Sequence, residues 1–266
     1  MTLPTINLNS TESIEQLKNV GGCFIAIPEE IEQNFQLIKK TSDMFFALPL
    51  EEKLKEPKTP DNYDGYLNQS ASGYDIERYI NSGGAPENEI MSAVNEAIQI
   101  TRAYLKNDIL QKALTAILNS LKIPAEKYQH CFTNYNNTLS IIHYLPQDTQ
   151  PDRLPAHADA ALLTVLWAPA PGLEAFVNDE WIATQTPPGH VILQIGDGLA
   201  EWTDHNVKPL LHRVIVEPNK PRTSIASFCT LDNEAPFNNL MTDKEISPTN
   251  LDYIKAHLQQ TYKPRA

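Results

Sequence analysis

The sequence predicts a mostly β core with flanking helices, an α+β arrangement, and three observations support this prediction. From residue 138 to residue 231, short apolar runs follow one another and are broken by Pro, Gly and Asp. No helical spacer separates these runs, so the strands are expected to pair antiparallel in a barrel or sandwich, and a jelly roll accommodates their number. Apolar residues recur at helical spacing in the first half of the chain and again after residue 242.

We expect one integrated structural domain with three regions. Residues 1–130 are predicted as an N-terminal helical region packed on the core, residues 131–241 as the β core, and residues 242–266 as a C-terminal helix that packs across the barrel or covers its mouth. One helix should follow Pro28 and end near Pro49, and a second helical stretch should run from Pro86 to Pro124. Between them, residues 61–84 are rich in Gly, Asn, Ser and Tyr, which indicates loops and short strands near an opening.

Turn-forming residues punctuate the predicted β core. The expected turns contain Ala-Pro-Gly172, Asn178-Asp179, Pro188-Gly189 and Gly196-Asp197-Gly198. Each turn is expected to join antiparallel strands.

Composition and charge exclude several classes of function. The chain has 21 Lys and Arg against 33 Asp and Glu, and the net charge of −12 repels nucleic acid and anionic lipid alike. Cys23, Cys131 and Cys229 are odd in number and far apart, which argues against a disulfide framework or a zinc ribbon and favours a reducing cytoplasm. No signal peptide is expected at the N-terminus, and no apolar run reaches the roughly 18 residues that span a bilayer, so a soluble protein is expected.

A candidate metal site begins with the sequence His157-Ala-Asp159. On an extended strand these two side chains project from one face, and both can bind the same ion. The third ligand comes from another part of the chain, and His190, His205 and His212 compete for that position. His212 lies in an apolar run typical of a central strand, whereas His190 starts a strand and His205 lies in a predicted turn, so His212 is favoured. Two imidazoles and one carboxylate with open positions are typical of non-heme Fe(II).

A candidate anion site follows on the next predicted strand. Arg222 and Ser224 are two residues apart, and therefore lie on one face. A guanidinium binds a carboxylate with a bidentate fork, and the serine hydroxyl adds a further donor. The alternative interpretation is an arginine on an exposed edge strand that makes a structural ion pair.

Several stretches together resemble the isopenicillin N synthase-like family of Fe(II)/2-oxoglutarate-dependent dioxygenases. Residues 196–228 are similar to the family's segment that runs from a Gly-Asp turn through His-Arg-Val to Arg-x-Ser and a following Phe. Residues 157–176 resemble its His-x-Asp, Leu-Thr-x-Leu and Gly-Leu stretch, and residues 138–146 its strand that usually reads Arg-Leu-Asn-Tyr-Tyr-Pro. Residues 3–8, 21–27 and 44–53 are also similar to the family's N-terminal region, so the resemblance is nearly end to end.

The resemblance implies a double-stranded β-helix, with Fe(II) held by His157, Asp159 and His212. It also implies that 2-oxoglutarate chelates the iron through its keto acid end, and that Arg222 and Ser224 bind its distal carboxylate. Tyr144 is a further candidate contact for the oxo acid. The expected reaction consumes O2, releases succinate and CO2, and oxidises a small-molecule substrate, with hydroxylation as the expected outcome. The retained Asp159 disfavours halogenation, because halogenating relatives lack this carboxylate.

Other functions stay open on the sequence. The first alternative is an oxidative cyclase or desaturase of the same fold that uses Fe(II) and O2 without 2-oxoglutarate. The second is a metal-binding sensor without turnover, and a zinc hydrolase ranks lower, because no separate general base has a recognisable placement. Candidate substrate contacts are the aromatic and histidine side chains of Tyr63, Tyr66, Tyr74, His143, Trp167, Phe228 and Phe237.

Overall fold

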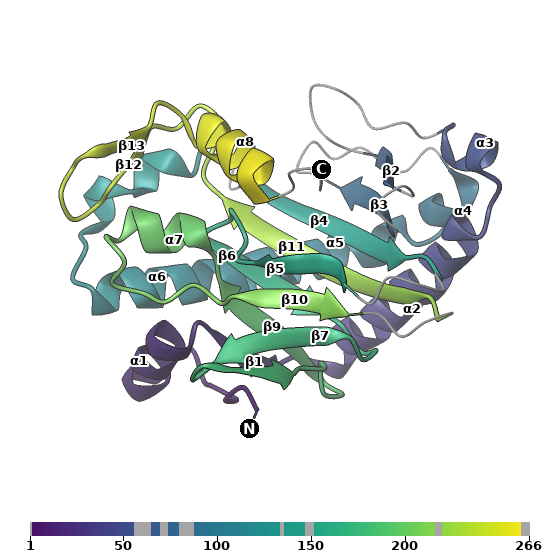
Figure 1. Ribbon diagram of the computed structural model, residues 1–266, viewed down its shortest axis with the longest axis horizontal. Helices are drawn as coiled ribbons and strands as arrows, with labels where there is room; N and C mark the ends of the chain where they lie inside the picture. The colour runs from purple at the N-terminus through teal and green to yellow at the C-terminus, as the bar shows by residue number, and fades with distance from the viewer. Residues whose placement is uncertain are drawn as a thin grey trace.

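Two antiparallel sheets form the core of the protein in a computed structural model, which describes residues 2–55, 65–69, 74–79, 88–133, 136–146, 152–215 and 220–261. The large sheet contains, from edge to edge, β1 (Gly22–Ala26), β9 (His190–Ile195), β6 (Leu163–Trp167), β11 (Arg222–Thr230), β4 (Asn136–Tyr144), β3 (Tyr74–Tyr79) and β2 (Gly65–Gln69). The small sheet contains β5 (Asp152–His157), β10 (His212–Ile215), β7 (Leu173–Val177) and β8 (Glu180–Ala183), and lies across one face of the large sheet (Figure 1). The predicted jelly roll with antiparallel pairing is confirmed.

Alternation along the central strands produces two apolar layers. Val165 and Leu193 belong to a core cluster that includes residues of the helices, whereas Leu166 and Ile192 belong to a cluster with residues of the small sheet. Successive side chains of a strand point to opposite faces, so a strand buried on both faces is apolar throughout. Even-numbered residues of β6, β9 and β11 therefore face the space between the sheets.

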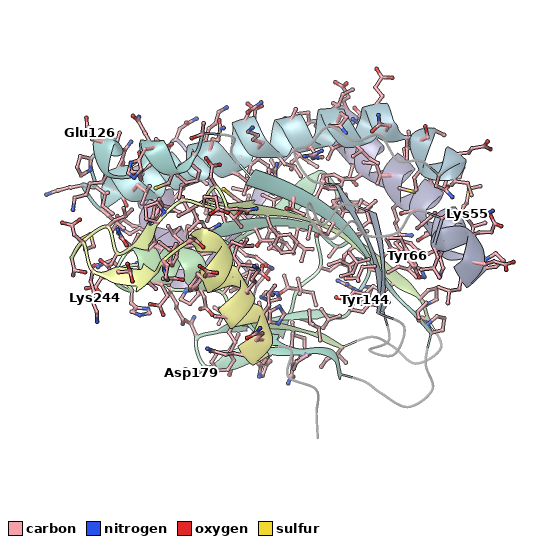
Figure 2. All side chains as sticks on the ribbon, turned by 90° about the horizontal axis from the view of Figure 1, so that it is seen from above. Lys55, Tyr66, Glu126, Tyr144, Asp179 and Lys244 are labelled. Atoms are coloured by element: carbon pink, nitrogen blue, oxygen red, sulfur yellow. The ribbon has the colours of Figure 1, made fainter. Side chains whose placement is uncertain are left out.

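Helices cover the other face of the large sheet. They are α1 (Thr11–Val20), α2 (Glu29–Phe46), α5 (Asn95–Tyr104), a π-helix (Leu105–Leu110) and α6 (Gln111–Ser120), with the short α3 (Leu50–Lys53) and α4 (Glu89–Ser92) beside them. Figure 2 shows the layer of α5 and α6 along one side of the sheet. The helix predicted between Pro28 and Pro49 is confirmed. The second stretch is divided into α4, α5, the π-helix and α6, and its predicted start at Pro86 lies outside the described residues.

The N-terminal region is less purely helical than the sequence predicted. β1, β2 and β3 extend the two edges of the large sheet, with β1 paired to β9 and β3 paired to β4. β1 carries Cys23 and Ile25 into the helix-side cluster and Phe24 into the cluster between the sheets. A five-residue apolar segment that serves both layers shows no helical periodicity, which is why it forms a strand.

The predicted turns at Asn178-Asp179 and at Pro188-Gly189 are confirmed, whereas the one at Gly196-Asp197-Gly198 is wrong. Asn178 and Asp179 adopt left-handed φ angles of 50° and 64° and join β7 to β8, as a two-residue hairpin turn requires. The predicted turn at Gly196-Asp197-Gly198 is instead the start of helix α7 (Asp197–Trp202). The two glycines serve close backbone packing there, because a Cβ on either one would collide with the carbonyls of residues 159–161.

The C-terminal segment begins with a hairpin and only then becomes helical. β12 (Phe237–Asn238) pairs with β13 (Glu245–Ser247), and α8 spans Asn250–Thr261. At the start of α8, Thr249 Oγ1 accepts from the Asp252 backbone N–H at 3.1 Å and donates to Asp252 Oδ2 at 2.8 Å, an N-terminal cap that fixes the beginning of the helix after Pro248. The predicted helix over residues 242–266 is therefore correct in kind but starts later. α8 lies on the side of the large sheet opposite α5 and α6 (Figure 2).

No helix among the described residues has both the length and the apolar character needed to cross a membrane.

Candidate active site

Two strands of the small sheet bring the predicted metal ligands together. His157 ends β5 and His212 begins β10, and the two residues are direct partners in the antiparallel pair. Asp159 follows two residues after the end of β5, and its Oδ1 lies 3.7 Å from His157 Nε2 and 3.9 Å from His212 Nε2. In the described part of the chain, this is the one group of three His, Cys, Asp or Glu residues with donor atoms all within 4.8 Å of one another. The strand predicted to carry both His157 and Asp159 thus ends before Asp159.

Backbone carbonyls fix the orientation of both imidazoles. His157 Nδ1 donates to the Pro155 carbonyl at 2.8 Å, and His212 Nδ1 donates to the Leu210 carbonyl at 3.0 Å. Since each Nδ1 carries the hydrogen, each neutral ring keeps its lone pair on Nε2, which faces Asp159. Both rings are therefore prepared as metal ligands by the fold itself.

The Asp159 carboxylate is positioned by β6 and by the start of α7. Thr164 Oγ1 donates to Asp159 Oδ2 at 2.6 Å, and the Asp197 backbone N–H donates to the Asp159 carbonyl at 2.7 Å. A Cβ at Gly196 would lie 2.6 Å from that same carbonyl oxygen, so this close approach requires glycine. The Gly-Asp sequence thus supports the loop that carries the carboxylate ligand.

The charges of the three groups are coupled. Burial alone would raise the pKa of Asp159, but hydrogen bonds and attraction from His157, His212 and Thr164 outweigh it and hold that pKa well below its usual range. Burial would lower the pKa of His157, but the hydrogen bond and the charge of Asp159 raise it overall. Burial, together with the charge of His157, lowers the pKa of His212. An ionised carboxylate beside a neutral imidazole is the state that binds a divalent cation.

Arg222 and Ser224 lie buried on β11, facing the space between the sheets. Arg222 is 4% exposed, and Ser224 is 2% exposed. Arg222 Nε donates to the Pro171 carbonyl at 3.1 Å, whereas its Nη2 has no hydrogen-bond partner among the described residues. Burial lowers the pKa of the guanidinium, because no carboxylate in the described part of the chain pairs with it. The alternative of an exposed arginine with a structural ion pair is wrong.

Tyr144 contacts Arg222 from the neighbouring strand. It is the partner of Arg222 in the β4–β11 register, and the guanidinium lies over its ring, 5.3 Å from the centroid. Figure 2 labels Tyr144 at the end of the sheet. This cation–π contact helps to orient the guanidinium.

The metal ligands and Arg222 face the same layer between the two sheets. His212 pairs with Ala175 on β7, and three residues earlier an added Cβ at Gly172 would lie 3.4 Å from Arg222 Cδ. Three residues of a strand span about 10 Å. The metal ligands and Arg222 are therefore adjacent to positions about 10 Å apart along the small sheet.

The donor set itself indicates which metal fits. Two imidazole nitrogens and one carboxylate oxygen on one side, with no thiolate, are typical of non-heme Fe(II) that keeps positions open for further ligands. The buried Nη2 of Arg222 indicates an anion at the other end. Together these residues fit iron and a dicarboxylate.

The predicted aromatic contacts divide into two groups. Phe228 lies on the same face of β11 as Arg222 and is the strand partner of Thr164, beside the metal ligands. Several others pack against the helical layer or elsewhere: Tyr66 against Phe45, His143 against Phe46, Trp167 against Phe35, and Phe237 against Tyr253. Tyr63 lies outside the described residues, and of Tyr74 only the backbone is described, opposite Tyr144.

Strand parity explains this division. His143 and Tyr144 are neighbours on β4 and so point to opposite faces, one toward α2 and one toward Arg222. Trp167 likewise faces α2, where its indole nitrogen donates to Glu32 at 3.2 Å. These two side chains are not brought together with the metal ligands.

The two competing histidines also lie elsewhere. His190 begins β9 and bonds the Pro188 carbonyl, and His205 lies in an exposed turn with a left-handed φ of 55°. The preference for His212 as third ligand agrees with this placement.

The sequence interpretation missed the residues that support the ligands. In the sequence, Thr164 is recognisable only as part of the Leu-Thr-x-Leu stretch, and Asp197 only as part of a predicted turn. His257 on α8 was not considered, although its Nε2 lies 2.8 Å from Asp197 Oδ2. A single threonine or histidine carries no spacing signal, so only the fold could assign these contacts.

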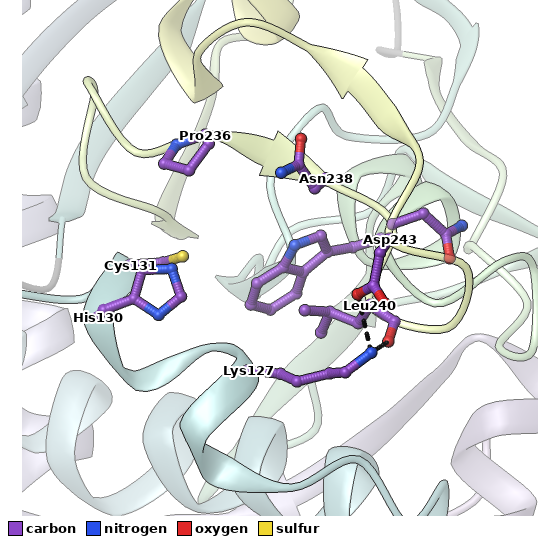
Figure 3. Close-up of a pocket in the computed structure, with 9 residues that line it drawn as sticks. Lys127, His130, Cys131, Pro236, Asn238, Leu240 and Asp243 are labelled. Carbon is purple, nitrogen blue, oxygen red and sulfur yellow. Dashed lines mark hydrogen bonds and ion pairs between the residues drawn. The ribbon is translucent and has the colours of Figure 1, made fainter.

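A cavity of about 230 Å³, shown in Figure 3, is lined by residues other than the metal ligands. Its lining includes Trp202 of α7, Cys131 and the loop between β12 and β13, and Lys127 there donates to Asp243 at 2.8 Å. Burial, and then the charge of Asp232, raise the pKa of Cys131 to about 11, so its thiol is not a nucleophile at neutral pH.

Comparisons with known proteins agree with the geometry. Residues 130–231 match the family described as the 2OG-Fe(II) oxygenase superfamily. The chain is 28% identical over 257 residues to UPF0676 protein C1494.01 of Schizosaccharomyces pombe, covering 86% of this chain and 77% of that protein. It is 28% identical over 222 residues to a leucoanthocyanidin dioxygenase of Perilla frutescens, covering 76% of this chain and 60% of that enzyme. Matches to several further curated relatives span only about half of their length.

Solved structures share the fold. The crystal structure of a full-length Neurospora crassa protein in complex with alpha-KG and 5-formyluracil superposes with a TM-score of 0.77 at 21% sequence identity. The match covers 96% of this chain and 91% of that one. The rice dioxygenase for auxin oxidation superposes with a TM-score of 0.73 at 17% identity, covering 97% of this chain and 95% of that one.

Proposed function

Because the chain belongs to the 2OG-Fe(II) oxygenase superfamily, we propose that it uses Fe(II), 2-oxoglutarate and O2 to oxidise a small molecule. Fe(II) and 2-oxoglutarate, predicted as the cofactor and co-substrate, are confirmed. The proposed outcome is hydroxylation of the substrate, with release of succinate and CO2.

One observation carries the proposal beyond family membership. A buried guanidinium, whose Nη2 has no hydrogen-bond partner in the described part of the chain, faces the same inter-sheet layer as a group of two histidines and one aspartate. A metal site alone gives no role to this cation, whereas a buried charge without a counter-ion destabilises the fold. A dicarboxylate that chelates the metal would account for both the metal ligands and the buried guanidinium.

Each residue has a distinct task in this proposal. His157, Asp159 and His212 hold the iron, and Thr164 keeps the Asp159 carboxylate in its orientation. Arg222 binds the distal carboxylate of 2-oxoglutarate with a charge-assisted fork, and Ser224 donates a further hydrogen bond. Tyr144 holds the guanidinium by packing against it.

The bound iron and oxo acid supply the oxidising power, through oxidative decarboxylation of 2-oxoglutarate. The chain contributes position and a dry environment. Apolar residues between the sheets, including Leu166 and Ala226, exclude bulk water from the interior between the two sites. Phe228, half buried beside Thr164, is the residue we propose for substrate contact.

The net charge and the buried cysteines bear on the substrate and the compartment of the protein. Net charge −12 supports a small molecule instead of nucleic acid as the substrate. Cys23, Cys131 and Cys229 are buried free thiols, which supports a reducing compartment such as the cytoplasm.

The test is co-substrate turnover by the whole chain. The purified protein is incubated aerobically with Fe(II) and 2-oxoglutarate, and succinate and CO2 are measured with and without panels of candidate small molecules. We expect slow succinate formation without substrate, faster formation with the right one, and none in Asp159→Ala.

Two outcomes would contradict the proposal. Oxygen consumption with product formation in the absence of 2-oxoglutarate would indicate the oxidative cyclase or desaturase alternative. No succinate from iron-loaded protein under any condition would contradict turnover and favour a metal-binding sensor.

A further inference from the structure

Gln194, on β9, is a buried amide that the site described above does not use. The residue is 1% exposed, and neither its Nε2 nor its Oε1 has a hydrogen-bond partner among the described residues. A buried polar group without a partner typically destabilises a protein, because its desolvation is not compensated by a hydrogen bond. Such groups are rare in folded proteins, and a role in binding or catalysis is one reason for keeping them.

The amide faces the space between the sheets. Ile192, two residues earlier on β9, belongs to the inter-sheet cluster, whereas Leu193 and Ile195 belong to the cluster on the helix side. Because side chains alternate along a strand, Gln194 shares the inner face with Ile192. The strand pairing of Gln194 places it near the metal ligands.

Gln194 is the direct partner of Thr164 in the β6–β9 register. Directly opposed residues on neighbouring antiparallel strands have Cβ atoms about 4.5–5.5 Å apart and project from the same face. The Thr164 hydroxyl is the group that donates to Asp159 Oδ2 at 2.6 Å. The amide therefore lies one strand away from the hydrogen bond that orients the carboxylate ligand.

Backbone contacts tie the end of β9 to both ligand loops. The Ile195 carbonyl accepts from Leu210 N–H at 2.9 Å, and the Leu210 carbonyl is the acceptor for His212 Nδ1. Asp197 N–H donates to the Asp159 carbonyl at 2.7 Å. Gln194 thus lies on the strand whose end, together with the residues that follow it, is hydrogen-bonded to the segments that carry His212 and Asp159.

We propose that Gln194 is a positioning residue for the metal ligands, which rests on the proposed function of that site. When a divalent cation draws Asp159 and the two imidazoles together, the Gln194 amide donates a hydrogen bond to Asp159 Oδ2. That oxygen already accepts from Thr164 and has a second acceptor site. The amide thus gains its hydrogen-bond partner when the metal binds. This hydrogen bond stabilises the metal-bound arrangement of the ligands relative to the metal-free one.

The experiment compares metal affinity with metal-free stability for Gln194→Leu. The probe is Co(II), titrated by calorimetry and by its visible absorption spectrum, because neither readout depends on turnover. We expect the dissociation constant of Co(II) to rise roughly 10–100-fold, as it does when other residues that hydrogen-bond to metal ligands are replaced. The melting temperature of the metal-free variant should stay equal or rise by about 2–4 °C, since the unpartnered amide is gone.

Weaker Co(II) binding without a loss of metal-free stability distinguishes a positioning role from a merely structural one. A variant that binds Co(II) within about twofold of wild type would overturn the inference. So would a metal-free melting temperature that falls by several degrees, because the amide would then stabilise the fold without the metal. If Gln194→Leu does not fold, Gln194→Met offers an unbranched apolar side chain of similar length for the same measurements.

Two controls keep the outcomes distinct. Asn34 on α2 also has a buried amide nitrogen without a partner among the described residues, so Asn34→Leu should leave Co(II) affinity unchanged. His212→Ala should lose Co(II) binding. If His212→Ala binds as wild type does, the proposed metal site itself is wrong, whereas loss in His212→Ala with no change in Gln194→Leu overturns only the role of Gln194.

Discussion

The three metal ligands and Arg222, which all face the space between the sheets, differ in how far the fold satisfies their own polar groups. At the metal end, both imidazoles donate to backbone carbonyls and Asp159 accepts from Thr164. At the anion end, Arg222 makes one hydrogen bond through Nε and leaves Nη2 without a partner among the described residues. The metal ligands are therefore oriented in advance by the chain, whereas the proposed co-substrate would supply the missing partner of Arg222. Preorganisation favours tight metal binding, and an unsatisfied cation favours selection of an anionic co-substrate.

Removing a metal ligand should produce the largest effect. Asp159→Ala and His157→Ala should lower succinate formation by about three orders of magnitude or more, since a catalytic metal contributes several kcal/mol and each 1.4 kcal/mol is about tenfold. Iron content after loading and desalting should fall with activity. His190→Ala, which removes a histidine outside the metal group, is the matched control and should retain iron. Full activity in Asp159→Ala would break the assignment of the metal end.

Arg222→Leu should separate stability from co-substrate binding. We expect the KM for 2-oxoglutarate to rise roughly 100-fold, because two charge-assisted hydrogen bonds of about 1.5–3 kcal/mol each are at stake. The free energy of unfolding without ligand should rise by on the order of 1 kcal/mol, because the unpaired buried charge is removed. Arg222→Lys keeps the charge without the fork, and should be intermediate in KM. A loss of stability with unchanged KM would show that the cation serves the fold.

The pH dependence of ligand binding should differ between the two ends. Asp159 raises the pKa of His157, so the metal-free ring holds its proton to higher pH than an ordinary histidine. Metal binds the deprotonated ring, so Co(II) affinity should fall as pH decreases through that pKa, by up to about tenfold per unit. Binding of 2-oxoglutarate through Arg222 should change little between about pH 6 and 8, because a guanidinium stays protonated. Calorimetry at several pH values measures both, and a metal affinity independent of pH would contradict the coupling.

The smallest expected effect concerns the contact between α8 and α7. His257 Nε2 lies 2.8 Å from Asp197 Oδ2, and the Asp197 backbone supports the Asp159 loop. His257→Ala should weaken metal affinity by about 2–5-fold, since a partly exposed hydrogen bond of this kind contributes up to roughly 1 kcal/mol. His257→Gln keeps a donor and should restore most of the affinity. Equal losses in both variants would indicate that packing of the ring on Tyr253 matters instead.

Much of the fold and the chemistry could be predicted from local sequence. Short apolar runs without helical spacers predicted antiparallel sheets, and helical periodicity after Pro28 predicted α2. Local sequence failed where close packing overrode residue preference. Gly196 and Gly198 have the composition of a turn, but they begin α7 because the Asp159 loop lies against them.

The sequence by itself determined the kinds of ligand, since His-x-Asp, a later histidine and Arg-x-Ser define a metal and an anion by their side-chain chemistry. Only the tertiary structure decided that His157 and His212 are strand partners, and that Arg222 is buried without a carboxylate among the described residues. It also decided that Phe228 faces the site whereas Trp167 faces α2. The physical reason is that strands alternate their faces, so function depends on register and on which layer covers each face, and both arise from contacts between residues distant in the chain.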